Sequence, residues 1–258
     1  MNSYFEDGFI KFSSGSLRAD LEDINQLLAR VLGINRNDSA FFEEVHLKLI
    51  KVYKDKDLYF GLLKSFTNSP IVQSLANNSD LIKFVKNCGV QEPSLVTPPI
   101  LHVVSDNLIL DREKVFTPPH QDVISTKGSV GQVVIWVPLH SISTDNYGIQ
   151  VYPGSHKLGI LEIDESSFGH TVKTKEIKNL QSQYIELDFG SAMIFSQYLI
   201  HFTHSVGKFR MAISFRFNDL TDKDWAKRKY FVPFNRSVVK DEFQDNRHIA
   251  PPNFEIKK

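Results

Sequence analysis

The spacing of the apolar residues changes at the stretch Pro93–Pro99, and this change limits the possible folds more than any other feature. Before this stretch, apolar side chains recur every three to four residues, as they do on one face of an α-helix. Leu21, Ile24, Leu28 and Val31 show this spacing. Helices are predicted over residues 17–32, 40–54, 57–65, 70–76 and 80–87, with Asp38 or Ser39 capping the second and Gly89 closing the last.

After this stretch, the apolar runs are short, rich in β-branched residues and separated by turn residues. Many short strands at fairly regular intervals favour a sandwich or barrel over a parallel sheet. Strands are predicted at residues 100–104, 108–110, 132–138, 150–152, 184–187, 192–195, 199–202 and 211–217. We therefore expect one domain of the α+β class with a mainly β core. Its parts are a helical segment at 1–97, an antiparallel double-sheet core at 98–220 and a tail at 221–258.

The charge balance excludes several classes of partner. Lys and Arg number 30, and Asp and Glu also number 30, so no net positive field attracts nucleic acid or a membrane surface. The longest apolar runs have the length of a strand, far below the ~20 residues that a membrane helix needs. A single cysteine, Cys88, excludes an internal disulfide and a cysteine-based metal site. We expect a cytoplasmic protein, and the sequence makes no prediction about its oligomeric state.

Nine histidines are the composition feature that points to chemistry. His46, His140, His170 and His248 have no partner acid at a useful spacing, so we interpret them as surface or core residues. His156 lies in a tight turn and is interpreted in the same way.

His120 and Asp122 are different, because they are two residues apart on a segment that Pro118 and Pro119 should keep extended. Side chains at alternate positions of an extended segment point to the same side. An imidazole nitrogen and a carboxylate oxygen on that side would form two-thirds of a facial metal triad of the kind that holds Fe(II). The pair alone is a weak signal, because such triplets occur by chance in many proteins.

The third ligand is predicted in the segment 199–210, which has the pattern of a strand, a turn and a second strand. A turn centred on Ser205 and Val206 would place His201 directly opposite Arg210 on one face. Arg210 would then supply a permanently charged clamp for a carboxylate near the metal. His204 would lie in the turn itself, which makes His201 the better ligand and leaves His204 as the alternative.

Four ordered blocks of this sequence resemble the phytanoyl-CoA dioxygenase family over roughly residues 100–225. The blocks are His120-Gln121-Asp122, residues 133–139, residues 148–157, and His201 with residues 210–214. Members of this family are Fe(II)- and 2-oxoglutarate-dependent oxygenases with a double-stranded β-helix, or jelly-roll, fold.

The resemblance implies a role for each matching residue. His120, Asp122 and His201 would bind iron, and Arg210 would bind the distal carboxylate of 2-oxoglutarate. Thr203 matches a Ser/Thr that helps to hold this co-substrate, Trp136 matches an aromatic residue lining the same pocket, and Ser214 is a weaker candidate for the same pocket. The expected catalytic and metal-binding residues are therefore His120, Asp122 and His201, and the expected co-substrate-binding residues are Arg210, Thr203, Trp136 and Ser214.

The chain departs from the family pattern in one loop. The interval of nine residues from His201 to Arg210 is shorter than is common in the family, and the usual asparagine is missing there. The carboxylate of Asp122 favours hydroxylation over halogenation, since related halogenases have a small residue at that position. Desaturation and cyclisation start with the same hydrogen abstraction and stay open.

The expected activity is therefore hydroxylation of a C–H bond in a small, polar metabolite, with O₂ as oxidant and release of succinate and CO₂. Lys227, Arg228 and Lys229 would either meet an anionic substrate or form a solvated face. Two other classes share the fold: an inactive jelly-roll binding protein and a metal-dependent isomerase or epimerase. The intact set of His120, Asp122, His201 and Arg210 argues against the first, and the second would not need the arginine.

Overall fold

The computed structural model describes residues 4–35, 40–96, 98–108 and 116–230. The predicted capping residues Asp38 and Ser39, residues 109–110 of one predicted strand, and most of the tail lie outside these ranges. The helices are α1 (Tyr4–Asp7), α2 (Gly15–Leu32), α3 (Phe41–Val52), α4 (Lys56–Thr67), α5 (Pro70–Ser74), α6 (Ser79–Asn87), α8 (Val123–Thr126), α9 (Thr174–Ile177) and α10 (Lys223–Lys227). None of the helices in the described ranges is long and apolar enough to cross a membrane.

The strands are β1 (Phe9–Ser13), β2 (Pro93–Leu95), β3 (Ile100–Val104), β4 (Val133–Pro138), β5 (Ile149–Val151), β6 (Ile163–Ser166), β7 (Gly169–Val172), β8 (Gln183–Tyr184), β9 (Ser191–Ser196), β10 (His201–Thr203) and β11 (Arg210–Asp219). The larger sheet has the order β1-β9-β4-β11-β2, with β3 also paired to β11. A smaller sheet has the order β10-β5-β8, and β6 pairs with β7 in a hairpin. All these pairs are antiparallel.

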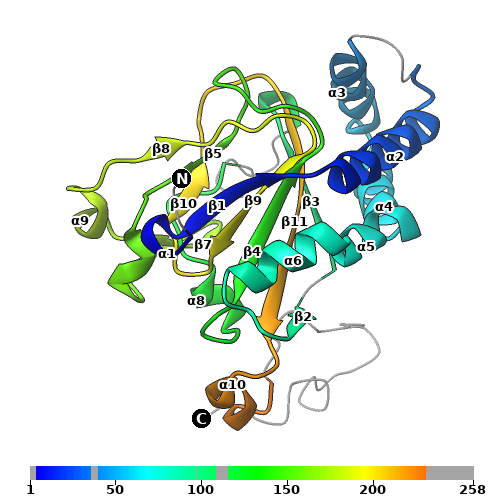
Figure 1. Cartoon of the computed structure of the whole chain (residues 1–258). Helices are drawn as coiled ribbons and strands as arrows, with labels where there is room; N and C mark the ends of the chain where they lie inside the picture. The colour runs from blue at the N-terminus through cyan, green and yellow to red at the C-terminus, as the bar shows by residue number, and fades with distance from the viewer. Residues whose placement is uncertain (1–3, 36–39, 97, 109–115, 231–258) are drawn as a thin grey trace, which may run out of the picture.

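The larger sheet is covered on both faces. Helices α2 to α6 gather on one side of it, and β5, β8 and β10 lie on the other (Figure 1). Along β4, Val133, Ile135 and Val137 pack toward the helices, whereas Val134 and Trp136 pack toward the small sheet. Side chains alternate across a strand, so a strand buried on both faces has a continuous apolar sequence. This explains why the run at residues 133–138 contains no charged residue.

The helical N-terminal part is confirmed in its main elements. Helix α2 begins after Ser14, whose side chain accepts a hydrogen bond from the Leu17 backbone, and ends at Gly33 in the left-handed conformation with φ 63°. Helix α3 begins after Ala40, which makes no side-chain cap bond. Two strands in the described residues of this part were not predicted: β1 pairs with β9 along its whole length, and β2 pairs with the end of β11.

The predicted hairpin between His201 and Arg210 is wrong. Strand β10 pairs with β5, so that His201 lies opposite Val151, whereas Arg210 on β11 lies opposite Val104 on β3. The chain between the two strands therefore crosses from one sheet to the other. Gly207 lies in this crossing, where a side chain would collide with the backbone of residues 146–147. Other boundaries differ as well: the strand predicted at 199–202 begins at His201, the strand predicted at 184–187 is β8 at Gln183–Tyr184, and Leu108 ends a short 3₁₀ helix.

Candidate active site

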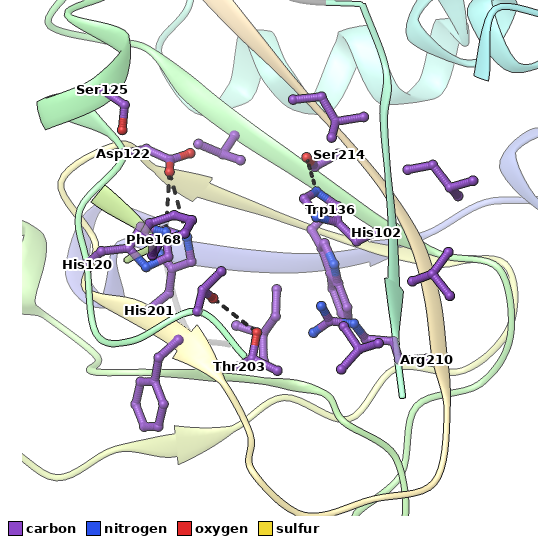
Figure 2. A pocket seen from close by; sticks show the side chains of 18 of the residues that line it. His102, His120, Asp122, Ser125, Trp136, Phe168, His201, Thr203, Arg210 and Ser214 are labelled. Atoms are coloured by element: carbon purple, nitrogen blue, oxygen red, sulfur yellow. Dashed lines mark hydrogen bonds and ion pairs between the residues drawn. The ribbon is translucent and has the colours of Figure 1, made fainter. Parts of the chain in front are cut away.

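Three potential metal ligands converge between the two sheets (Figure 2). His120, Asp122 and His201 are buried, and their possible ligand atoms all lie within 4.8 Å of one another. The Oδ1 atom of Asp122 is 3.7 Å from Nε2 of His120 and 3.9 Å from Nε2 of His201. Two imidazole nitrogens and one carboxylate oxygen, all approaching from one side, are the ligand set of facial Fe(II) sites with open coordination positions.

Backbone pairing brings the two histidines together. The N–H of His120 donates to the carbonyl of His201 at 3.0 Å, and the reverse bond is 3.1 Å long. The segment that holds Asp122 is not extended, contrary to expectation, because Asp122 has φ −66° and ψ −28° at the start of α8. His120 and Asp122 converge because the chain turns into a helix after His120, and not through the alternation of side chains along a strand.

The other ring nitrogen of each histidine is held by the backbone. Nδ1 of His120 lies 2.7 Å from the Pro118 carbonyl, and Nδ1 of His201 lies 3.0 Å from the Leu199 carbonyl. A carbonyl only accepts, so each Nδ1 carries the proton and each Nε2 keeps its lone pair for a metal. Burial lowers the pKa of His120 to about 3 and lowers the pKa of His201 in the same direction. Both rings are therefore neutral, as ligands must be.

Asp122 has a partner that the sequence analysis missed. The Nε and Nη2 atoms of Arg216 lie 2.8 Å and 2.7 Å from Oδ2 of Asp122. Burial alone would raise the pKa of this carboxyl, but the charged guanidinium of Arg216 outweighs burial and holds the pKa well below its ordinary value. Asp122 is therefore a carboxylate at neutral pH. Arg216 could have been predicted from its even spacing from Arg210 along an apolar strand, because this spacing puts both side chains on the same face.

Arg210 lies on the opposite side of the site from the two histidines (Figure 2). Its side chain is buried, and within the described residues no acidic side chain pairs with it. Its bond to the Gly148 carbonyl is long, at 3.4 Å, and its Nε is buried with no hydrogen-bond partner in the described part of the chain. Burial lowers the pKa of Arg210 to about 10, so it stays charged at neutral pH. An unpaired buried cation is costly, and a bound carboxylate would satisfy it.

The remaining predicted residues also line the cavity. The guanidinium carbon of Arg210 lies 5.7 Å from the ring centroid of Trp136, whose indole nitrogen is buried without a hydrogen-bond partner among the described residues. Thr203 makes a 3.0 Å hydroxyl contact with Thr117. Ser214 lies 2.7 Å from Nε2 of His102, a residue that the sequence analysis did not consider.

The cavity has a volume of about 680 Å³ and reaches from the histidines to helix α4. Its outer wall is apolar and includes Tyr59, Phe60 and Leu63 of α4. Phe168, at the tip of the β6–β7 hairpin, lies with its ring 4.6 Å from the ring of His120. His170, interpreted above as a residue without a role in chemistry, lines the cavity too.

Several candidates lie elsewhere. The ring of His204 packs on Tyr184 at 5.0 Å, and His204 is not part of the converging ligand group. His156 bonds to the Phe5 carbonyl. Arg228 donates to the carbonyls of Lys127 and Gly128, and neither it nor Lys227 lines the cavity.

The sequence profile of the family described as phytanoyl-CoA dioxygenase (PhyH) matches residues 4–212. No curated protein gives a sequence match. Among solved structures, the non-heme monooxygenase ThoJ in its apo form is 14% identical to this chain in sequence. The alignment covers 84% of this chain and 75% of the ThoJ chain, with a TM-score of 0.53.

Two further structures are similar to this chain. EctD from S. alaskensis in its apo form is 14% identical, with 85% of this chain and 75% of EctD covered and a TM-score of 0.53. The non-heme α-ketoglutarate-dependent carbocyclase SnoK from nogalamycin biosynthesis is 12% identical, with 87% of each chain covered and a TM-score of 0.52. At these identities the likeness concerns the fold, and it confirms a jelly-roll core with helices packed on it.

Proposed function

The chain belongs to the phytanoyl-CoA dioxygenase family, and on this basis we propose that it hydroxylates a C–H bond of a small molecule with Fe(II), 2-oxoglutarate and O₂. The observation that carries the proposal is the pairing of two features in one cavity. A buried group of two neutral histidines and one carboxylate lies on one side, and a buried arginine without an acidic partner among the described residues lies on the other.

His120, Asp122 and His201 would hold the iron. Two nitrogen donors and one oxygen donor suit Fe(II), and the absence of thiolate from this group fits iron better than structural zinc. The iron, once bound, would supply the O₂ chemistry that no side chain can perform. The carbonyls of Pro118 and Leu199 hold the two rings in the orientation and tautomer that this role requires.

Arg210 would bind the distal carboxylate of 2-oxoglutarate, with Trp136 beside it and Thr203 along the path toward the histidines. The unpaired nitrogen of Arg210 and its burial make a carboxylate the best-fitting anion. Ser214 is a weaker candidate, because its hydroxyl already contacts His102. In the balanced reaction, 2-oxoglutarate leaves as succinate and CO₂. One atom of O₂ enters succinate and the other enters the substrate as a hydroxyl group.

The primary substrate would occupy the outer part of the cavity, between Phe168 and helix α4. The sequence predicts a polar metabolite, and the apolar wall at Tyr59, Phe60 and Leu63 favours one that also carries an apolar portion. Phe168 would exclude water from the face of His120 that it covers. We also retain the proposal that residues 1–258 form one dioxygenase domain, with parts at 1–97, 98–220 and 221–258.

Anaerobic titration of the metal-free protein with Fe(II) and then 2-oxoglutarate tests the proposal. The native protein should develop a weak visible charge-transfer band that requires both additions. Asp122→Ala should lose the band, while Arg18→Met, at an exposed position, should keep it. Absence of the band in the native protein would contradict the proposal and would favour a binding protein without activity. A succinate assay with a metabolite library would then identify the substrate and separate hydroxylation from desaturation or cyclisation.

A further inference from the structure

On the basis of the proposed function, we propose that Arg216 is a positioning residue that makes Asp122 bind the metal through one oxygen only. Two nitrogens of Arg216 contact the same atom, Oδ2, at 2.8 Å and 2.7 Å. The other oxygen, Oδ1, is the one that lies 3.7 Å and 3.9 Å from the two histidine nitrogens. The two oxygens of the Asp122 carboxylate therefore have separate roles. Oδ2 accepts hydrogen bonds from Arg216, and Oδ1 is the oxygen that would coordinate the metal.

This division matters because carboxylates bind metals through one oxygen or through both. A six-coordinate metal held by His120, His201 and Oδ1 alone keeps three open positions, which are enough for a two-point co-substrate and O₂. If Oδ2 also bound, one of these positions would be lost. Arg216 holds Oδ2 away from the metal with two charge-assisted contacts, and this protects the third position.

The backbone of Arg216 is hydrogen-bonded to a neighbouring segment on each side, so it holds the arginine side chain in a fixed position. In the larger sheet, Arg216 lies opposite Val134 of β4, and its carbonyl accepts a 2.8 Å hydrogen bond from the Val96 backbone. Its side chain is 13% exposed. Since strand side chains alternate, Arg210, Ser214 and Arg216 project from the same face of β11, toward the cavity that all three line.

The geometry favours this role over that of an anchor for an anionic substrate. Two of the three guanidinium nitrogens of Arg216 are already on Oδ2, and the third, Nη1, is buried without a partner among the described residues. Only Nη1 is left for an anion, unless the anion displaces Asp122 from Nε and Nη2. Arg210, in contrast, is not paired with a carboxylate of the described chain and is the available anion site.

The test uses Mn(II) alone, without co-substrate or turnover. Mn(II) affinity is measured by titration, and the number of metal-bound waters is measured by the relaxation of water protons. We compare the native protein with Arg216→Met and Arg216→Lys, and with the exposed control Arg18→Met. Circular dichroism establishes that each variant is folded. If Arg216→Met does not fold, Arg216→Gln takes its place, because its neutral amide removes the charge but keeps one donor.

We expect Arg216→Met to bind Mn(II) about 10- to 100-fold more weakly, or to retain one water fewer, as loss of an outer partner of a metal ligand typically does. Arg216→Lys should recover part of the difference, because its ammonium group can still donate to Oδ2. A folded Arg216→Met with native affinity and a native water count would overturn the inference, as would an equal loss in Arg18→Met. Native protein that binds no Mn(II) would instead overturn the proposed metal site itself.

Discussion

At the scale of single residues, Arg210 and Arg216 show how one residue type serves two purposes on one strand. Arg216 is neutralised by Asp122, whereas Arg210 is buried with no carboxylate partner in the described part of the chain. Of the two, Arg210 is therefore the one whose charge is available to a dianionic co-substrate. The two arginines should respond differently to mutation, since one acts on the metal ligand and the other on the co-substrate.

Replacing Arg210 should weaken 2-oxoglutarate binding without weakening metal binding. Hydrogen bonds to charged groups contribute about 1.5–3 kcal/mol, so Arg210→Gln should raise the Kd of 2-oxoglutarate about 10- to 100-fold. Calorimetric titration of the Mn(II)-loaded protein measures this change, and Mn(II) titration provides the matched control. An unchanged Kd for 2-oxoglutarate would show that another group binds its carboxylate.

The sequence was sufficient to place the candidate ligands together but not to explain their geometry. His120 and Asp122 are near neighbours in the chain, so a local pattern contains both. Arg216 and His102 belong to the site through contacts with Asp122 and Ser214, and each contact joins segments about 90 or more residues apart, which no local pattern specifies. The assignment of roles to His120, Asp122, His201, Arg210, Thr203, Trp136 and Ser214 remains a prediction.

At the scale of elements, helices were predicted better than strand pairing. Helix α2 was recognised because its apolar face repeats within eighteen residues. The pairing of β10 with β5 was missed because both strands are only three residues long and lie far apart in the sequence. Strand β1 was missed because its partner, β9, lies near the other end of the chain.

Helix α2 also allows a test of which side chains hold the helices on the sheet. Leu21 is fully buried, whereas Val31, predicted on the same face, is 46% exposed. Leu21→Ala should lower the free energy of unfolding by about 2–5 kcal/mol, and Val31→Ala should change it by less than about 0.5 kcal/mol. Urea denaturation measures both. Equal effects would mean that the buried face of α2 lies elsewhere.

At the scale of the whole molecule, partly buried neutral histidines should make the protein sensitive to acid. Burial lowers the pKa of His102 to about 3 and that of His140 to about 4, whereas an unfolded histidine titrates near 6.5. Between pH 6.5 and about 4, the unfolded chain thus binds protons that the folded protein does not. Stability should fall as the pH falls, by up to about 1.4 kcal/mol per pH unit for each such histidine.

Denaturant unfolding of the metal-free protein between pH 5 and 7.5 measures this dependence. His140→Gln should reduce the slope by about one proton, because it removes one titrating group that is neutral in the folded protein. A free energy of unfolding that stays constant from pH 7 to pH 5 would contradict the neutral state of these rings.

The pairing of β1 with β9 has a consequence for how the protein folds during synthesis. Phe9 lies opposite Phe195 in the folded sheet. One of the first strands to be synthesised therefore cannot pair until one of the last has been synthesised. Contacts between such distant segments form slowly, because a long loop must close before they contribute any stability. While the nascent chain is on the ribosome, β1 presents an open edge to other chains. Its completion is therefore a late event, after the β9 segment has left the ribosome.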